Sequence, residues 1–175
     1  VEFVGITRGN KLTVIDNSGR TLWKSKESYG ASKDILGTLS STIDGDRHPT
    51  NNPESIYMHT RIIVQDLNGD GAPEIILGRN RLADITLFNR LRSFEGSSIA
   101  ALSWDEGIMK KTWESPELSG YTIDVQILRD KNHPGKFRVI SVEQENSSNL
   151  MPFWRTKKSV VHSYLIGGNE SSTTP

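Results

Sequence analysis

Short runs of apolar and β-branched residues alternate with clusters of glycine, asparagine, aspartate and proline along the whole chain. Runs of this kind are typical of β-strands joined by turns. Only residues 81–92 space their apolar positions as a helix would, and a packed loop fits that stretch equally well. We therefore predict an all-β fold. The predicted strands are residues 2–8, 11–16, 20–24, 56–64, 74–78, 98–104, 109–114, 122–128, 137–142 and 159–166.

Two segments that lie 64 residues apart share a strand, an Asp-x-Asn loop and a second strand. Asp66 in RIIVQDLNGDGAPEIILG corresponds to Asp130 in VQILRDKNHPGKFRVISV. Upstream, EFVGITRGN aligns with EIILGRNRL, and a glycine-containing turn before Trp23 aligns with one before Trp113. The 175 residues therefore hold about 2.7 copies of a four-strand unit, and the first copy begins partway through. The copies span about 2–65, 66–129 and 130–166.

A four-stranded antiparallel sheet that repeats along a chain predicts a β-propeller, in which each sheet is one blade. This unit is longer than usual because two stretches, 27–54 and 80–96, are inserted. A propeller closes with roughly 4–8 blades, so we expect residues 1–167 to be a segment of a larger or multi-chain propeller. An uncompleted first unit would leave an open strand edge for a neighbour. Residues 168–175 are predicted to be a flexible tail.

One loop carries the pattern of a metal site, Asp66-Leu-Asn-Gly-Asp-Gly-Ala-Pro-Glu74. Oxygen ligands at alternating positions, a glycine at the sixth and a carboxylate at the ninth suit Ca²⁺, which takes 6–8 hard oxygen ligands. Carboxylates this close repel one another unless a cation compensates them. The candidate ligands are Asp66, Asn68, Asp70, the main-chain carbonyl of Ala72, and Glu74.

Two other interpretations of this loop are an EF-hand and a metal-free turn. An EF-hand needs a glutamate at the twelfth position and a helix on each side. Here the twelfth residue is Leu77, and strand-like segments flank the loop, so the EF-hand and dockerin alternatives fail. A turn held by aspartate and asparagine side chains without any metal stays open as the alternative.

The segment VQDLNGDGAPEIILG resembles the calcium loop of FG-GAP/VCBS repeats, the blade unit of integrin-α-type propellers. The flanking phrases SIAALSWDEG, KKTWESPELSGYTIDVQI and KLTVIDNSGRTLWKS are similar to the rest of such blades. The resemblance covers most of residues 2–166, apart from the insertion at 27–54. It implies Ca²⁺ as the cofactor, held by Asp66, Asn68, Asp70, Ala72 and Glu74.

The corresponding loop of the third copy departs from this pattern. Pro134 stands where Asp70 stands, and Arg138 stands where Glu74 stands. Two carboxylates are lost and one cation is gained, so we expect no calcium there. The guanidinium of Arg138 is predicted to take the place of the metal and to bond Asp130 and Asn132.

Composition excludes several classes of function. There are 21 Lys+Arg and 21 Asp+Glu, so the net charge is zero, which argues against nucleic acid as a partner. No apolar run approaches the roughly 18 residues of a membrane span. The absence of cysteine excludes thiolate metal sites and cysteine nucleophiles.

The remaining candidates for chemistry are isolated residues. The histidines at 48, 59, 133 and 162 are scattered and do not have zinc-site spacing. The tryptophans at 23, 104, 113 and 154 are expected to pack between blades. Among them, Trp154 is the best candidate for stacking on a sugar instead. Asp44 and Asp46 form a weak second metal motif. The sequons at Asn146 and Asn169 would permit N-glycans.

These observations predict a non-enzymatic, calcium-stabilised binding or assembly module that is secreted, on the cell surface or periplasmic. Its expected partner is a protein, or an additional chain or domain, that completes the propeller. Recognition is expected on the inserted stretches 27–54 and 80–96, since loops on a rigid scaffold carry binding. The alternatives are a carbohydrate-binding or carbohydrate-active module and a structural coat or filament subunit. The sequence identifies neither the ligand nor the number of blades.

Overall fold

The computed structural model describes residues 2–39, 54–83, 92–145 and 158–167. Within these ranges every regular element is a β-strand, and all paired strands are antiparallel, which confirms the all-β prediction. The described residues include no helix with the length and hydropathy of a membrane span. The strands are β1 (Glu2–Ile6), β2 (Leu12–Asp16), β3 (Thr21–Lys24), β4 (Ile35–Leu39), β5 (Glu54–Tyr57), β6 (Ile62–Gln65), β7 (Glu74–Leu82), β8 (Phe94–Asp105), β9 (Ile108–Glu114), β10 (Tyr121–Arg129), β11 (Phe137–Gln144) and β12 (Ser159–Ile166).

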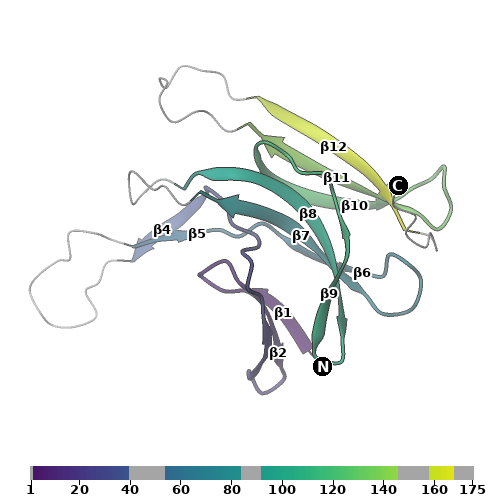
Figure 1. Ribbon diagram of the computed structural model, residues 1–175, viewed down its shortest axis with the longest axis horizontal. Coiled ribbons are helices and arrows are strands. Elements are labelled where there is room, and N and C mark those ends of the chain that lie inside the picture. Colours follow the sequence, from purple (N-terminus) through teal and green to yellow (C-terminus); the bar gives the residue numbers. More distant parts are fainter. Residues whose placement is uncertain (1, 40–53, 84–91, 146–157, 168–175) are drawn as a thin grey trace, which may run out of the picture.

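The strands pair in chain order, so that each sheet is a simple meander (Figure 1). The first sheet is β1-β2-β3, the central sheet is β6-β7-β8-β9, and the third sheet is β10-β11-β12. The hairpin β4-β5 forms a separate two-stranded sheet. The aligned segments of the sequence therefore occupy equivalent places, because both Asp-x-Asn loops join the first and second strands of a sheet.

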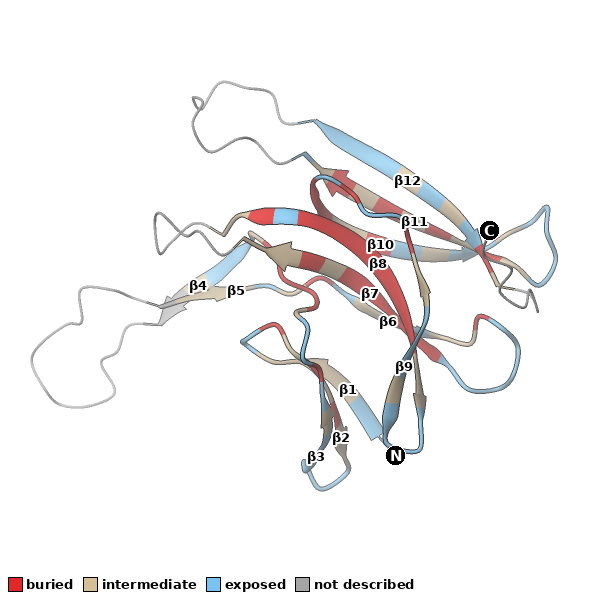
Figure 2. Cartoon of the chain, viewed as in Figure 1, coloured by how far each residue is buried: buried red, intermediate tan, exposed pale blue. Residues whose placement is uncertain are grey.

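The three main sheets are stacked, with the central sheet in the middle (Figure 1). Ile75 and Leu77 pack with Leu12 of the first sheet, whereas Ile76 packs with Val125 and Val139 of the third. Alternate residues of a strand point to opposite faces, so three consecutive buried residues on β7 mean that both faces are covered. Figure 2 shows this burial as long red stretches on β7 and β8.

One buried asparagine joins parts of the chain that are far apart in sequence. The side chain of Asn80 on β7 is completely buried and donates from Nδ2 to the carbonyls of Ala31 (2.7 Å) and Thr122 (2.8 Å). Its Oδ1 accepts the Thr122 backbone N–H at 2.8 Å. Because Thr122 lies on β10 and Ala31 follows the first sheet, Asn80 fixes the central sheet to both neighbouring segments.

The prediction of a single strand over residues 56–64 is wrong. β5 ends at Tyr57 and β6 begins at Ile62, and the two strands belong to different sheets. Between them the backbone is held by long-range hydrogen bonds, in which Met58 N–H donates to Asp34 and Thr60 N–H donates to Gly30. The insertion at 27–54 also contains β4, a strand that the sequence analysis did not predict.

The insertion at 80–96 is shorter than its sequence suggests. β7 continues to Leu82 and β8 already begins at Phe94, and these strand ends pair with each other. The helical spacing that starts at residue 81 is therefore misleading for Arg81 and Leu82, which are in a strand. Residues 84–91 lie outside the described part of the chain.

The described residues form a stack of sheets and do not close into a ring. The central sheet has the predicted four strands, and the other two main sheets each have three. The structure thus supports the repeated antiparallel unit, while a complete propeller stays a prediction.

Candidate metal site

The predicted metal loop joins β6 to β7 at one end of the central sheet. Gly69 and Gly71 have φ angles of 80° and 89°, in the left-handed region that glycine adopts without a steric cost. These two glycines turn the backbone sharply, so that its N–H groups point toward the loop's own side chains. The Asp66 carboxylate accepts two of them, from Gly69 (2.6 Å) and Gly71 (3.0 Å).

The other predicted side-chain ligands form one connected group. Asn68 Nδ2 donates to Asp70 Oδ2 at 2.9 Å and to Glu74 Oε1 at 3.0 Å. Asp70 N–H donates to Asn68 Oδ1 at 2.8 Å, and Ala72 N–H donates to Asp70 Oδ1 at 2.7 Å. The structure therefore brings Asn68, Asp70 and Glu74 together, with Ala72 beside them.

Glu74 is the buried member of this group. Its side chain is on the first residue of β7, the residue is only 3% exposed, and Oε2 accepts the Leu67 N–H at 2.8 Å. Leu67 packs into the core between the central and third sheets with Phe137 and Ile166. The loop is thus anchored on its inner side, while Asn68, Asp70 and Ala72 are exposed.

The residues of this loop have side chains that suit a hard cation. In this structure they form hydrogen bonds to one another. Within the described ranges, no group of three or more His, Cys, Asp or Glu side chains is arranged to hold a metal ion. In this loop the Asn68 amide lies between the carboxylates of Asp70 and Glu74 and supplies its hydrogens to both. A cation would replace those hydrogens, and the amide would then present its oxygen. All the side-chain ligand atoms would then be oxygens, which suit Ca²⁺.

The charge of the loop supports the same assignment. Among the described residues, no lysine, arginine or histidine forms an ion pair with Asp66, Asp70 or Glu74. Buried carboxylates are ordinarily paired or coordinate a metal. Glu74 receives only neutral amide donors in this arrangement.

The matching loop in the third sheet contains its own cation. Arg138 Nε donates to Asp130 Oδ2 at 2.8 Å, and Nη2 reaches the same oxygen at 2.5 Å. His133 Nδ1 lies 2.9 Å from Asp130 Oδ1. Bonds from His133 and Arg138 hold the pKa of Asp130 well below its usual range. The predicted Arg138–Asp130 bond is confirmed, and of the two expected partners only Asp130 is bonded.

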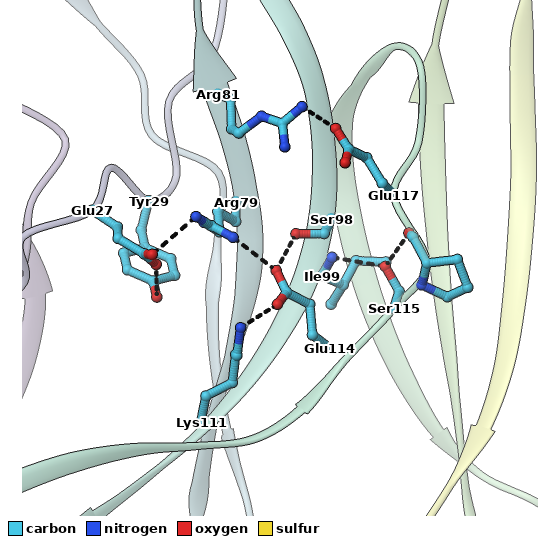
Figure 3. Close-up of polar contacts among 11 residues, drawn as sticks. Glu27, Tyr29, Arg79, Arg81, Ser98, Ile99, Lys111, Glu114, Ser115 and Glu117 are labelled. Carbon is cyan, nitrogen blue, oxygen red and sulfur yellow. Dashed lines mark hydrogen bonds and ion pairs between the residues drawn. The ribbon is translucent and has the colours of Figure 1, made fainter. Parts of the chain in front are cut away.

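A second polar cluster, which the sequence analysis missed, lies where the central sheet meets the segment after the first sheet (Figure 3). Arg79 on β7 bonds Glu114 and Glu27, each at 3.0 Å. Ser98 Oγ donates to Glu114 at 2.6 Å, and Lys111 pairs with the same carboxylate. Partial burial acts in the opposite direction, but bonds from Lys111, Ser98 and Arg79 lower the pKa of Glu114 to about 2. Every charge in this cluster has a partner, so it connects elements and leaves no free group for chemistry.

A third cluster joins the sheet β10-β11-β12 to the β9–β10 connection. Glu143, 5% exposed, accepts the Gly120 N–H and lies 2.7 Å from His162 Nε2. The His162 ring stacks against Tyr164 at 6.3 Å. Burial raises the pKa of Tyr164. Arg79 with Glu114 and Glu143 with His162 are distant pairs in sequence, which explains why no local motif revealed them.

The remaining candidate residues divide into two groups. Trp23 and Trp113 pack against the two inter-sheet cores, as predicted, and Trp104 Nε1 donates to Glu2 at 2.8 Å. His59 is on the link between β5 and β6, and burial lowers its pKa. The others lie outside the described residues: Asp44, Asp46, His48, Asn146, Trp154 and Asn169.

Comparison of the chain with protein-family models, with curated proteins and with solved structures found no match.

Proposed function

We propose that this protein is a calcium-stabilised, non-enzymatic binding or assembly module of the FG-GAP/VCBS type, built as a β-propeller segment that works outside the cytoplasm. Asp66, Asn68, Asp70, Ala72 and Glu74 would hold one Ca²⁺. The metal would offset most of the negative charge of the loop's carboxylates and tie β6 to β7. Its role is structural, so no reaction is assigned to it.

One observation carries this proposal: two matching loops differ in charge at equivalent positions. Where the third sheet has Arg138 bonded to Asp130, the central sheet has the buried carboxylate of Glu74 at the equivalent position. The loop of the third sheet therefore has a positively charged side chain, whereas the loop of the central sheet receives none from the described residues. A bound Ca²⁺ would offset two of the three negative charges of Asp66, Asp70 and Glu74, as Arg138 offsets the charge of Asp130.

Calcium titration of the full chain tests the proposal. We expect one site per chain by calorimetry, with an affinity in the 10⁻⁴–10⁻³ M range of extracellular modules. Binding to the folded state alone stabilises by about 2.7 kcal/mol at 100 times Kd, so the melting temperature should rise in calcium. Magnesium should act more weakly, because it requires a near-ideal octahedral site.

Asp70→Ala should abolish both the heat of binding and the calcium-dependent rise in melting temperature. Asp105→Ala is the matched control, since Asp105 is an exposed aspartate at the end of β8 that pairs only with Lys110 among the described residues. The control should retain full calcium binding. Absence of heat and of any melting shift, up to about 10 mM calcium, would reduce the loop to a hydrogen-bonded turn.

A further inference from the structure

Among the described residues, no sheet covers the outer face of the first sheet or the outer face of the third sheet. On the third sheet, Leu128, Val161 and Leu165 are exposed by 55%, 67% and 38%. On the first sheet, Phe3 is 54% exposed. Exposed large apolar side chains that gather on one face of a sheet indicate an interaction surface.

Strand register places the exposed residues of the third sheet on a single face. Val161 is paired with Val142, while Leu165 and Leu128 are both paired with Arg138. Side chains of directly paired residues lie on the same side of a sheet. Ile140, two residues from both Arg138 and Val142, lies between them on this face. We call the surface of Leu128, Ile140, Val142, Val161 and Leu165 the tail face.

The internal repeat shows what kind of surface the tail face corresponds to. Ile140 aligns with Ile76 at the repeat spacing of 64 residues. Ile76 is completely buried because the third sheet covers the face of the central sheet on which it lies. The tail face is therefore the equivalent of a face that another sheet already covers in this protein.

The opposite end of the stack presents the complementary kind of face. Phe3 aligns with Ile75, whose side of the central sheet is covered by the first sheet. Phe3 is paired with Ile15 and has no sheet packed on its side among the described residues. We call the surface around Phe3 and Ile15 the head face.

We propose that the tail face of one copy binds the head face of a second copy, so that the chain assembles head to tail. This inference rests on the assembly role in the proposed function and names the partner as the chain itself. Each junction within the chain already packs a tail-type face against a head-type face, and the proposed contact continues that arrangement across molecules. By register, the tail face also carries Asp124, Gln126, Arg138 and Ser163, and Arg138 lies between Leu128 and Leu165. Asp124 pairs with Arg61 at 2.7 Å. Interfaces between separately folded chains ordinarily mix apolar and polar residues in this way.

Sedimentation velocity of the full chain, from micromolar to submillimolar concentration and in calcium, tests the assembly. We expect the average mass to rise with concentration. Val161→Lys on the tail face and Phe3→Lys on the head face should each weaken self-association by at least about tenfold. Leu128→Lys is the second tail-face variant, used if Val161→Lys alters the circular dichroism spectrum. Leu36→Lys is the control, because Leu36 is 70% exposed on β4, away from both faces, and should leave assembly unchanged.

Mixing the two interface variants separates a head-to-tail contact from a symmetric one. Val161→Lys retains an intact head face and Phe3→Lys retains an intact tail face, so their mixture should form a one-to-one dimer although each alone is monomeric. A wild-type chain that stays monomeric throughout, or variants that fail to complement, would overturn the proposal. A monomer that is nevertheless stabilised by calcium would leave the proposed metal site standing. Assembly without any calcium response would support the head-to-tail contact and overturn the proposed metal site.

Discussion

In the loop of the third sheet, Arg138 supplies the positive charge that we propose a metal ion supplies in the loop of the central sheet. The side chains of Arg138 and Asp130 are 37% and 4% exposed, whereas those of the similar pair Arg20 and Asp16 are 76% and 18% exposed. Exposed ion pairs contribute little because water and salt screen them. Removing the partner of a carboxylate that is hardly exposed leaves an unsatisfied charge, which is costly.

We therefore predict that Arg138→Met lowers the free energy of unfolding at neutral pH, and by more than Arg20→Met does. Urea denaturation of both variants measures the difference. Calcium should not rescue Arg138→Met, because the loop of the third sheet has lost two of the carboxylates that a metal would need. Equal effects of the two substitutions would show that the Arg138–Asp130 pair contributes no more to the free energy of unfolding than the exposed Arg20–Asp16 pair.

The sequence revealed the candidate metal loop and its altered copy because the residues of each loop lie within nine positions of one another. Spacing alone was sufficient to propose Asp66 and Glu74 as ligands, and to pair Arg138 with Asp130. It could not reveal that Glu74 is buried, since that depends on the third sheet covering the end of β7. Nor could it place Asn80, whose partners Ala31 and Thr122 lie 49 and 42 residues away.

At the scale of elements, the Glu114 cluster joins three neighbouring strands to a segment outside their sheet. Arg79 on β7, Ser98 on β8 and Lys111 on β9 all contact one carboxylate, and Arg79 extends the contact to Glu27. Glu114 has a pKa of about 2 in the folded protein against 4.5 in the unfolded chain. A lowered carboxylate pKa contributes stability above the unfolded value, and this contribution is lost as the pH falls toward the folded value.

Glu114→Gln should therefore destabilise the protein at pH 7, and the deficit should shrink as the pH falls from about 5 to about 2. The measurement is denaturant unfolding of both proteins across that range, read as the difference between them, because Asp16 and Asp130 also have lowered pKa values. Glu95→Gln controls for the loss of one exposed negative charge. A deficit that stays constant with pH would mean that Glu114 acts by packing alone.

The sequence predicted most strands but failed where pairing depends on distant contacts. Residues 56–64 look like one strand locally, and hydrogen bonds to Asp34 and Gly30 divide them. The strand β4 was missed because its partner β5 comes from the other end of a long insertion. Periodicity identifies apolar faces, whereas the choice of partner strand is made by the rest of the fold.

At the scale of the whole molecule, the central sheet differs from its neighbours because it is covered on both faces. β7 and β8 contain consecutive buried residues, while β12 is exposed along most of its length. Local opening is least favourable where the most apolar contact must be broken. The order of stability should therefore follow the order of stacking.

Hydrogen exchange followed by mass spectrometry should find the slowest exchange in peptides covering β7 and β8. Peptides covering β1 and β12, each at the edge of an outer sheet, should exchange faster. The comparison is best made at low protein concentration, where self-association adds no protection. Uniform protection across the sheets would indicate that the stack opens only as a unit.

The position of Leu67 has a consequence for how the ion and the fold influence each other. This residue lies between two proposed ligands, Asp66 and Asn68, and its side chain packs against Phe137 and Ile166 of the third sheet. If the loop binds calcium as proposed, its occupancy and the docking of that sheet would be thermodynamically linked, and linkage is reciprocal. Calcium would tighten the attachment of the third sheet, and a contact that stabilises the third sheet would raise the affinity for calcium by the same factor. A change in calcium concentration would then alter the stability of the sheet to which a second copy is proposed to bind.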